Sequence, residues 1–291
     1  MGGVVHTLRA FAAVAATIGA LAVAPASANA AYWVGLGDSF AAGPLIPSQT
    51  LNPLGCLRST RNYARQASAQ LGVSLRDVSC SGAETAEMTT SQETYAGTNP
   101  PQLDAIAADT RVVSLQIGGN DIGFTEILTN CQTANPFGRP CQDRYVRNGV
   151  DELRRRIGET APKVAAVLRD IKARSLDRAR IVVLNYEAIL PSSGSGCWPQ
   201  VPLAWADVPY VRGIQLELNA MIARQVTEAN REYGPGVRLA DTYTASLGKD
   251  ACKGSGTRWL EPLVPGNAAA PFHPNARGMT GVTPTVVAAA S

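Results

Sequence analysis

Short apolar runs alternate with longer segments of helical period along most of this chain. Apolar runs bounded by turn residues predict buried strands, and apolar positions recurring every three to four residues predict helices. The predicted strands are Trp33–Leu36, Ser74–Val78, Val112–Ile117, Ile181–Asn185 and Val237–Leu239. The predicted helices are Asn62–Leu71, Gln102–Ala107, Tyr145–Ala173 and Val211–Tyr233. This alternation is typical of an α/β domain built on a parallel sheet.

Several segments depart from this regular pattern. Pro162 lies inside the clearest helical stripe, and we expect it to kink or divide that helix. Thr280, Gly281 and Pro284 weaken the helical character of the C-terminal stretch. Structureless loops as long as those of this chain are usually functional. The three longest loops are Ala41–Cys56, Asn130–Arg144 and Pro191–Pro209.

The first 30 residues have the pattern of a secretory signal. Arg9 precedes an apolar run that ends near Ala24, and small residues continue to Ala30. The run is short for a membrane span, although an uncleaved N-terminal anchor is the alternative. The sequence shows no other candidate span. We therefore expect residues 1–30 to be a signal peptide and residues 31–291 to form one secreted, extracellular domain.

The balance of charge narrows the range of partners. The formal net charge of +3 falls to about +2 when Arg9 is removed with the leader. Charge this nearly balanced gives no electrostatic argument for binding nucleic acid or an anionic membrane. We expect no nucleic-acid partner and no transmembrane segment in the mature chain, which we expect to be a monomer.

All six cysteines follow the leader, and an even count in an exported protein predicts three disulfides. Sequence alone does not choose among the possible pairings. Pairing of nearest neighbours would join Cys56 to Cys80, Cys131 to Cys141 and Cys197 to Cys252. A metal site is the alternative. The chain has no Cys-x-x-Cys pair and only one histidine after the leader, so we expect neither metal nor cofactor.

Four residues could carry nucleophilic chemistry, because each follows a predicted strand and the carboxyl ends of parallel strands share one edge of the sheet. Ser39 could be a nucleophile, and His273 could accept its proton near neutral pH. Gly82 could present a backbone N–H, and Asn120 a side-chain amide, to an oxyanion. We expect the four to meet at this edge.

Each of these residues also has a purely structural interpretation. Asp38 and Ser39 favour helix N-caps, and Gly82 suits a turn. Gly118-Gly119-Asn120 suits a turn as well, and a lone loop histidine is commonly solvent-exposed.

The chain resembles the GDSL/SGNH hydrolase family, most closely its actinobacterial secreted lipase/esterase branch. Gly37-Asp38-Ser39-Phe40 looks like the first block of that family and Gly82 like its second. Gly118-Gly119-Asn120-Asp121 looks like the third block, and His273 like the last. The resemblance spans roughly residues 32–278, and the branch is consistent with nearest-neighbour disulfides.

The resemblance implies a three-layer α/β/α sandwich around a parallel sheet, with the flavodoxin-like SGNH fold, and hydrolysis of carboxylic esters. Ser39 would be the nucleophile and His273 the general base. The backbone N–H groups of Ser39 and Gly82 and the side chain of Asn120 would form the oxyanion hole.

One position departs from the family pattern. Many members carry an aspartate three residues before the histidine, where this chain has Ala270. Members of the branch use a backbone carbonyl instead, so we expect the Ala270 carbonyl to orient His273. Asp241 or Glu261 would be the alternative source of an acid.

The substrate class stays open at this point. The branch resemblance favours lipid or fatty-acyl esters, and a carbohydrate acetylesterase or a non-catalytic secreted binding module is the alternative. Aromatic residues of the long loops could line an acyl groove or stack on a sugar. They are Trp198, Trp205, Tyr210 and Trp259.

Overall fold

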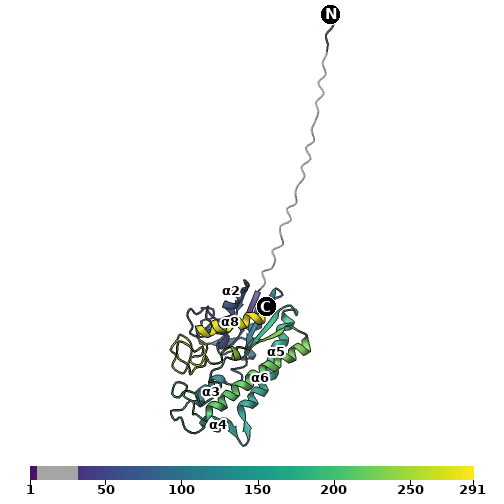
Figure 1. Ribbon diagram of the computed structural model, residues 1–291. Coiled ribbons are helices and arrows are strands. Elements are labelled where there is room, and N and C mark those ends of the chain that lie inside the picture. The colour runs from purple at the N-terminus through teal and green to yellow at the C-terminus, as the bar shows by residue number, and fades with distance from the viewer. Residues whose placement is uncertain (5–31) are drawn as a thin grey trace.

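A five-stranded parallel sheet forms the centre of the molecule (Figure 1). This computed structural model describes residues 1–4 and 32–291, so the predicted signal peptide lies outside the described residues apart from its first four. The strands, in spatial order, are β2 (Ser74–Asp77), β1 (Tyr32–Gly37), β5 (Thr110–Gln116), β8 (Arg180–Leu184) and β9 (Val237–Ala240). All five predicted strands are confirmed.

Helices cover both faces of this sheet, which confirms the three-layer α/β/α sandwich. The pair on one face is α2 (Tyr63–Gln70) and α8 (Ala276–Ala290), and the pair on the other is α5 (Glu152–Arg174) and α6 (Asp207–Tyr233) (Figure 1). The strand order, with the first strand between the second and third of the sheet, is that of flavodoxin-like folds. Because both faces are covered, the central strands are nearly continuous apolar runs.

Two of the predicted helices were wrong in part. Residues 146–151 form a hairpin, β6 (Val146–Arg147) and β7 (Val150–Asp151), because Asn148 and Gly149 adopt the left-handed backbone of a tight turn. The segment expected to be helical from Gln102 is a single 3-10 turn, η3 (Gln102–Ala105). The Gln102 side chain is occupied there by hydrogen bonds to the N–H and C=O of Gly37.

The long helix α5 runs through Pro162 without a break, contrary to our expectation. Asp151 caps its first turn, and a buried apolar stripe stabilises it along its length. The C-terminal segment likewise forms a regular helix, α8, capped by Asn275. Gly281 weakens its propensity but is required for packing, since a Cβ there would lie 2.2 Å from the ring of Trp259.

The remaining elements are short and lie in the connections. They are α1 (Ser39–Ala42), η1 (Leu54–Cys56), η2 (Ala86–Met88), β3 (Gln92–Thr94), β4 (Gly97–Asn99), α3 (Phe124–Cys131), α4 (Pro140–Tyr145) and α7 (Thr242–Ala245). None of the helices in the described ranges is long and apolar enough to cross a membrane.

Three disulfides hold the long loops, in the nearest-neighbour pairing. Cys56–Cys80 joins the loop after β1 to the segment after β2, and Cys131–Cys141 joins α3 to α4. Cys197–Cys252 has a sequence separation of 55 residues, against 10 for Cys131–Cys141. A longer closed loop removes more conformational entropy from the unfolded chain.

We therefore expect the disulfides to differ in their contribution to stability. Replacing both Cys197 and Cys252 by serine should lower the free energy of unfolding by about 4 kcal/mol, and replacing Cys131 and Cys141 by about 3 kcal/mol. Denaturant unfolding of the oxidised variants measures both. A larger loss for the 131–141 pair would contradict the loop-entropy argument.

Candidate active site

Ser39 is the first residue of the short helix α1, directly after the turn that follows β1. Gly37 makes that turn possible, because a Cβ there would lie 2.4 Å from the carbonyl oxygen of Gln116. Asp38 caps the short helix α1 by accepting the N–H of Phe40 at 2.9 Å. Asp38 is therefore the capping residue of this dipeptide, while Ser39 opens the helix with its hydroxyl facing His273.

The structure brings Ser39 and His273 into direct contact. Their atoms Oγ and Nε2 lie 2.7 Å apart, and Nδ1 of the same imidazole lies 2.7 Å from the carbonyl oxygen of Pro271. Because a carbonyl can only accept, Nδ1 carries the ring proton and Nε2 is left to accept the serine proton. This is the geometry of a nucleophile and its general base.

The carbonyl that holds the imidazole belongs to Pro271, so the prediction of Ala270 was wrong by one residue. The Ala270 carbonyl accepts the backbone N–H of His273 at 3.2 Å and closes a turn. Pro271 and Phe272 occupy the centre of this turn, and Phe272 has a φ of 60°. Since the turn uses the Ala270 carbonyl, the Pro271 carbonyl is the one that faces the ring.

Neither of the alternative acids is bonded to His273 through its carboxylate. Asp241 caps α7 and accepts hydrogen bonds from Thr244 and from Nδ2 of Asn185. Glu261 is fully buried and meets the histidine loop through its main chain, where its N–H donates to the His273 carbonyl and its C=O accepts the Phe272 N–H.

The Glu261 carboxylate organises the loop that carries His273. It accepts hydrogen bonds from the guanidinium of Arg258, from the side chains of Asn267 and Asn275, and from the backbone N–H groups of Gly266 and Asn267. Burial raises the pKa of Glu261, but these hydrogen bonds outweigh burial and hold its pKa at about 2. The carboxylate is thus an ionised anchor at neutral pH.

The imidazole lies in a largely apolar environment. Its ring centroid is 5.1 Å from that of Phe40 and 6.1 Å from that of Phe124. Burial lowers the pKa of His273 below its ordinary value, and the hydrogen bond to Pro271 offsets part of this effect. The ring is therefore neutral at physiological pH, as a proton acceptor must be.

Gly82 and Asn120 lie on two neighbouring loops at the same edge of the sheet. Gly82 lies in a turn and has a φ of 84°, so the prediction that it suits a turn is confirmed for its backbone conformation. The Asn120 side chain donates one of its two N–H bonds to the carbonyl of Ala83 at 2.9 Å. This contact fixes the Asn120 loop against the Gly82 loop and leaves the second amide N–H for a ligand.

An apolar pocket lies near the Ser39–His273 pair, reached through Phe124, whose ring centroid is 6.1 Å from that of His273. Gly119 and Phe272, neighbours of Asn120 and His273, form part of its wall. Aliphatic side chains from α3, α6 and the segment between β8 and α6 form most of the rest, including Ile127, Leu203 and Ile214.

The loop aromatics lie away from this pocket and have other partners. The Trp198 indole donates to the Thr133 carbonyl, and Trp205 packs edge-on against Phe137. Trp259 lies over α8 at Gly281, and the hydroxyl of Tyr210 bonds to Asp151. None of these four aromatic residues lines the apolar pocket.

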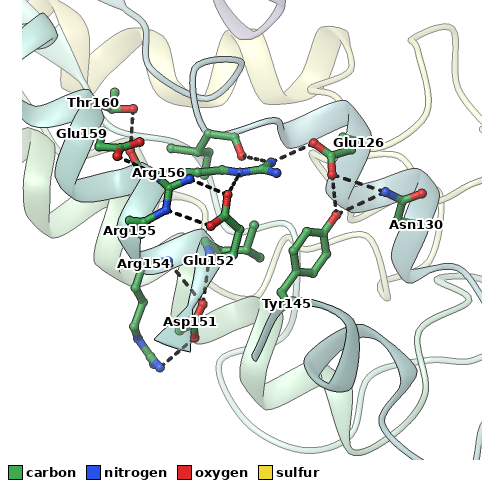
Figure 2. Close-up of polar contacts among 12 residues, drawn as sticks. Glu126, Asn130, Tyr145, Asp151, Glu152, Arg154, Arg155, Arg156, Glu159 and Thr160 are labelled. Carbon is green, nitrogen blue, oxygen red and sulfur yellow. Dashed lines mark hydrogen bonds and ion pairs between the residues drawn. The ribbon is translucent and has the colours of Figure 1, made fainter. Parts of the chain in front are cut away.

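A charged network holds α3, one wall of the pocket, against α5 (Figure 2). Arg156 of α5 donates to the Glu126 carboxylate at 2.7 Å and to the carbonyl of Ile122 at 3.2 Å. Tyr145 and Asn130 complete the network around Glu126, and the hydrogen bond from Arg156 lowers the pKa of that carboxyl. The pocket wall is thus anchored to the N-terminal part of α5.

The fold and the site agree with one family of enzymes. Residues 36–280 match the model of the GDSL-like lipase/acylhydrolase family. The chain belongs to this family. Its members are carboxylic ester hydrolases, and the chain is one of them by this membership and by the lipases and esterase it resembles.

Proteins of Streptomyces are among the relatives of this GDSL hydrolase. Lipase 2 of Streptomyces coelicolor is 40% identical over 88% of this chain and 84% of its own length. The crystal structure of an extracellular lipase from Streptomyces rimosus is 26% identical with a TM-score of 0.73, covering 89% of this chain and 100% of that chain. A phospholipase A1 from Streptomyces albidoflavus NA297 is 25% identical with a TM-score of 0.74, covering 90% and 100%.

Sequence reasoning missed two parts of this GDSL site. Glu261 was considered as an acid and not as an anchor, although its neighbours Arg258 and Asn267 are the partners that a buried carboxylate needs. Tyr186 was not considered at all, and its hydroxyl bonds to Asp38. The signal was available, because Tyr186 follows β8 at the same strand edge that led to the other four residues.

We expect Glu261→Gln to destabilise the fold strongly, since it leaves Arg258 without its buried charge partner. The free energy of unfolding at pH 7 should fall by about 3–5 kcal/mol. The folded pKa is below the ordinary value of 4.5, so the contribution of the carboxylate is present above that value and is lost as pH falls towards about 2. Parent and variant should therefore converge in stability over that acidic range.

Urea unfolding at pH 7, 4 and 3 measures this convergence. Glu217→Gln is the matched control, because Glu217 also pairs with an arginine but at the surface, and it should cost about 1 kcal/mol or less. Equal losses in the two variants would contradict the anchoring role of Glu261.

Proposed function

We propose that this GDSL hydrolase cleaves fatty-acyl esters through a covalent intermediate on Ser39. The observation that carries the proposal is the 2.7 Å contact between Ser39 Oγ and His273 Nε2 beside an apolar pocket. The pair supplies a nucleophile with its base, and the apolar lining of the nearby pocket favours an acyl chain over a polar group.

In the acylation step, Ser39 Oγ attacks the ester carbonyl carbon while its proton passes to His273 Nε2. The carbonyl oxygen becomes an oxyanion, which the N–H groups of Ser39 and Gly82 and the Asn120 amide stabilise. Within the described ranges, neither of these two backbone N–H groups donates to another residue. His273 then protonates the alcohol oxygen, and the C–O bond to the leaving alcohol breaks.

In the deacylation step, His273 removes a proton from water, and the resulting oxygen nucleophile attacks the acyl carbon. The bond to Ser39 Oγ breaks, the proton returns to Ser39, and the carboxylic acid leaves. The Pro271 carbonyl keeps the imidazole in one tautomer through both steps, which is a large part of what an aspartate does in a triad. It stabilises the imidazolium less than a carboxylate would, because it carries no full charge.

We further propose that the enzyme acts outside the cell after removal of residues 1–30. The signal pattern of the leader supports this, and so do three disulfides, which persist in oxidising compartments. The resemblance to an extracellular lipase points in the same direction.

The mechanism predicts which substitutions abolish ester hydrolysis. With p-nitrophenyl esters from acetate to palmitate, Ser39→Ala and His273→Ala should each lower kcat by about 10³-fold or more. Asp241→Asn should retain activity of the same order as the parent chain, because Asp241 caps α7 and bonds to Asn185 without contacting His273. Steady-state kinetics on purified mature protein measure all three variants.

Two outcomes would contradict the mechanism. A loss of about 10³-fold in a folded Asp241→Asn variant would show that the dyad depends on a carboxylate. A folded parent chain without activity on any of these p-nitrophenyl esters would remove the lipid assignment and favour a carbohydrate ester or a binding module.

The acyl pocket predicts a shift in chain-length preference. Val211 lies on α6, half-buried in the pocket wall, and Val211→Trp should fill the space that a long acyl chain would occupy. We expect kcat/KM to fall for long esters and to change little for acetate and butyrate. Leu216→Trp, an exposed position on the same helix, is the control. An unchanged length profile in Val211→Trp would show that the acyl chain binds elsewhere.

A further inference from the structure

A buried tyrosine connects the two loops that carry the proposed nucleophile and the proposed amide donor. The hydroxyl of Tyr186 donates to Oδ2 of Asp38 and accepts the backbone N–H of Gly119 at 2.7 Å. Asp38 directly precedes Ser39, and Gly119 directly precedes Asn120. One oxygen atom therefore joins the turn after β1 to the turn after β5.

Each end of this bridge has a defined partner. The other carboxylate oxygen of Asp38 accepts the N–H of Phe40 in the first turn of α1, so the position of Asp38 sets the start of the helix that presents Ser39. At the far end, a Cβ on Gly119 would lie 3.0 Å from Cζ and Oη of Tyr186. A glycine is needed there because the tyrosine ring lies directly against the loop.

Tyr186 is itself held tightly. Its backbone N–H and C=O both bond to the side-chain amide of Asn219 on α6, each at 2.9 Å. Its ring packs edge-on against Phe40 with centroids 5.1 Å apart, and the side chain is 4% exposed. The hydroxyl thus has a fixed position, which a group that orients two loops requires.

The electrostatics of the bridge favour this direction of hydrogen bonding. Burial raises the pKa of Tyr186 well above its ordinary value, so the hydroxyl keeps the proton that it donates. Burial also raises the pKa of Asp38 to about 7, and the hydrogen bond from Tyr186 opposes that rise. When Asp38 is ionised, above about pH 7, donation to its carboxylate makes the phenol oxygen a better acceptor for the Gly119 N–H.

We infer that Tyr186 is a positioning residue for ester hydrolysis, whose hydroxyl holds Ser39 and Asn120 in register across the β1 and β5 loops. This inference rests on the proposed function, because it assigns a role within that reaction. Tyr186 acts through Asp38 and Gly119. Loss of its hydroxyl misplaces the oxyanion donors relative to the nucleophile, and errors of about 1 Å in such sites cost up to about 100-fold in rate.

The test is Tyr186→Phe in the full mature chain, with p-nitrophenyl butyrate as the substrate. The ring and its packing remain, and only the bridging hydroxyl is lost. We expect kcat to fall between about tenfold and about 100-fold, with KM within about twofold of the parent value, because phenylalanine keeps the ring that Tyr186 contributes to the pocket wall. A residue with a merely structural role would not separate kcat from KM in this way.

Tyr210→Phe is the matched control. Tyr210 is also buried and also bonds to an aspartate, Asp151 at 3.1 Å, but at the N-terminal end of α5. Tyr186→Phe loses two buried hydrogen bonds and Tyr210→Phe loses one, so Tm should fall in both variants and further in Tyr186→Phe, whereas Tyr210→Phe should keep the parent kcat. Parent kcat in Tyr186→Phe, or an equal decrease in kcat in both variants, would overturn the inference.

A second variant covers the case in which Tyr186→Phe does not fold. Asp38→Asn preserves the cap on Phe40 through its amide oxygen but places an NH2 group, which cannot accept, where the carboxylate oxygen accepted the tyrosine proton. A folded Asp38→Asn chain with the parent kcat and KM would also overturn the inference. Failure of the proposed function gives a different result. There the parent chain and Ser39→Ala would hydrolyse the ester equally, and the inference would fall with its premise.

Discussion

The contact between Ser39 and His273 joins residues 234 positions apart, and the rest of the site is arranged around it. The serine reaches this contact from the carboxyl end of β1, where Gly37 allows the chain to turn against Gln116. The histidine reaches it from a loop without regular secondary structure. Such a loop needs its own support, and the buried Glu261 carboxylate supplies it through charge-assisted hydrogen bonds. A hydrogen bond of 2.7 Å between distant segments is therefore a property of the whole fold.

The two halves of the pair differ in how rigidly their surroundings define them. Ser39 is held by a helix cap and by strands that are buried on both faces. His273 is held by a turn in which Phe272 adopts a left-handed conformation and by the main-chain contacts of Glu261. Non-glycine residues in this conformation are uncommon and occur where surrounding structure enforces them. Here the enforcing contacts are the Phe272 N–H to the Glu261 carbonyl and the Ala270–His273 hydrogen bond.

Sequence reasoning predicted those features that depend on local pattern. Buried strands appear in the sequence as apolar runs, so all five strands were predicted. The carboxyl ends of parallel strands share one edge of the sheet, and Ser39 and His273 are in contact there. Sequence reasoning failed where the contact depends on the orientation of a single peptide group. Whether the Ala270 or the Pro271 carbonyl faces His273 is decided by the conformation of one turn. Sequence reasoning also could not predict the pocket, whose wall combines residues from 119 to 272, or α5 passing through Pro162, because tertiary packing overrides local propensity there.

The carbonyl that holds the proposed base has a consequence for variation in this protein. A carboxylate in this role is specified by one codon, and a single nucleotide change can remove it. A main-chain oxygen is present whatever residue occupies the position, so no side-chain substitution deletes it. What can change is the shape of the turn that aims it, and here Pro271 restricts φ and so narrows the shapes available. The orientation of the imidazole is therefore inherited as a backbone conformation that several residues determine together. Variation that affects it is expected in the turn and in the Glu261 support, and not at an acid bonded to the ring.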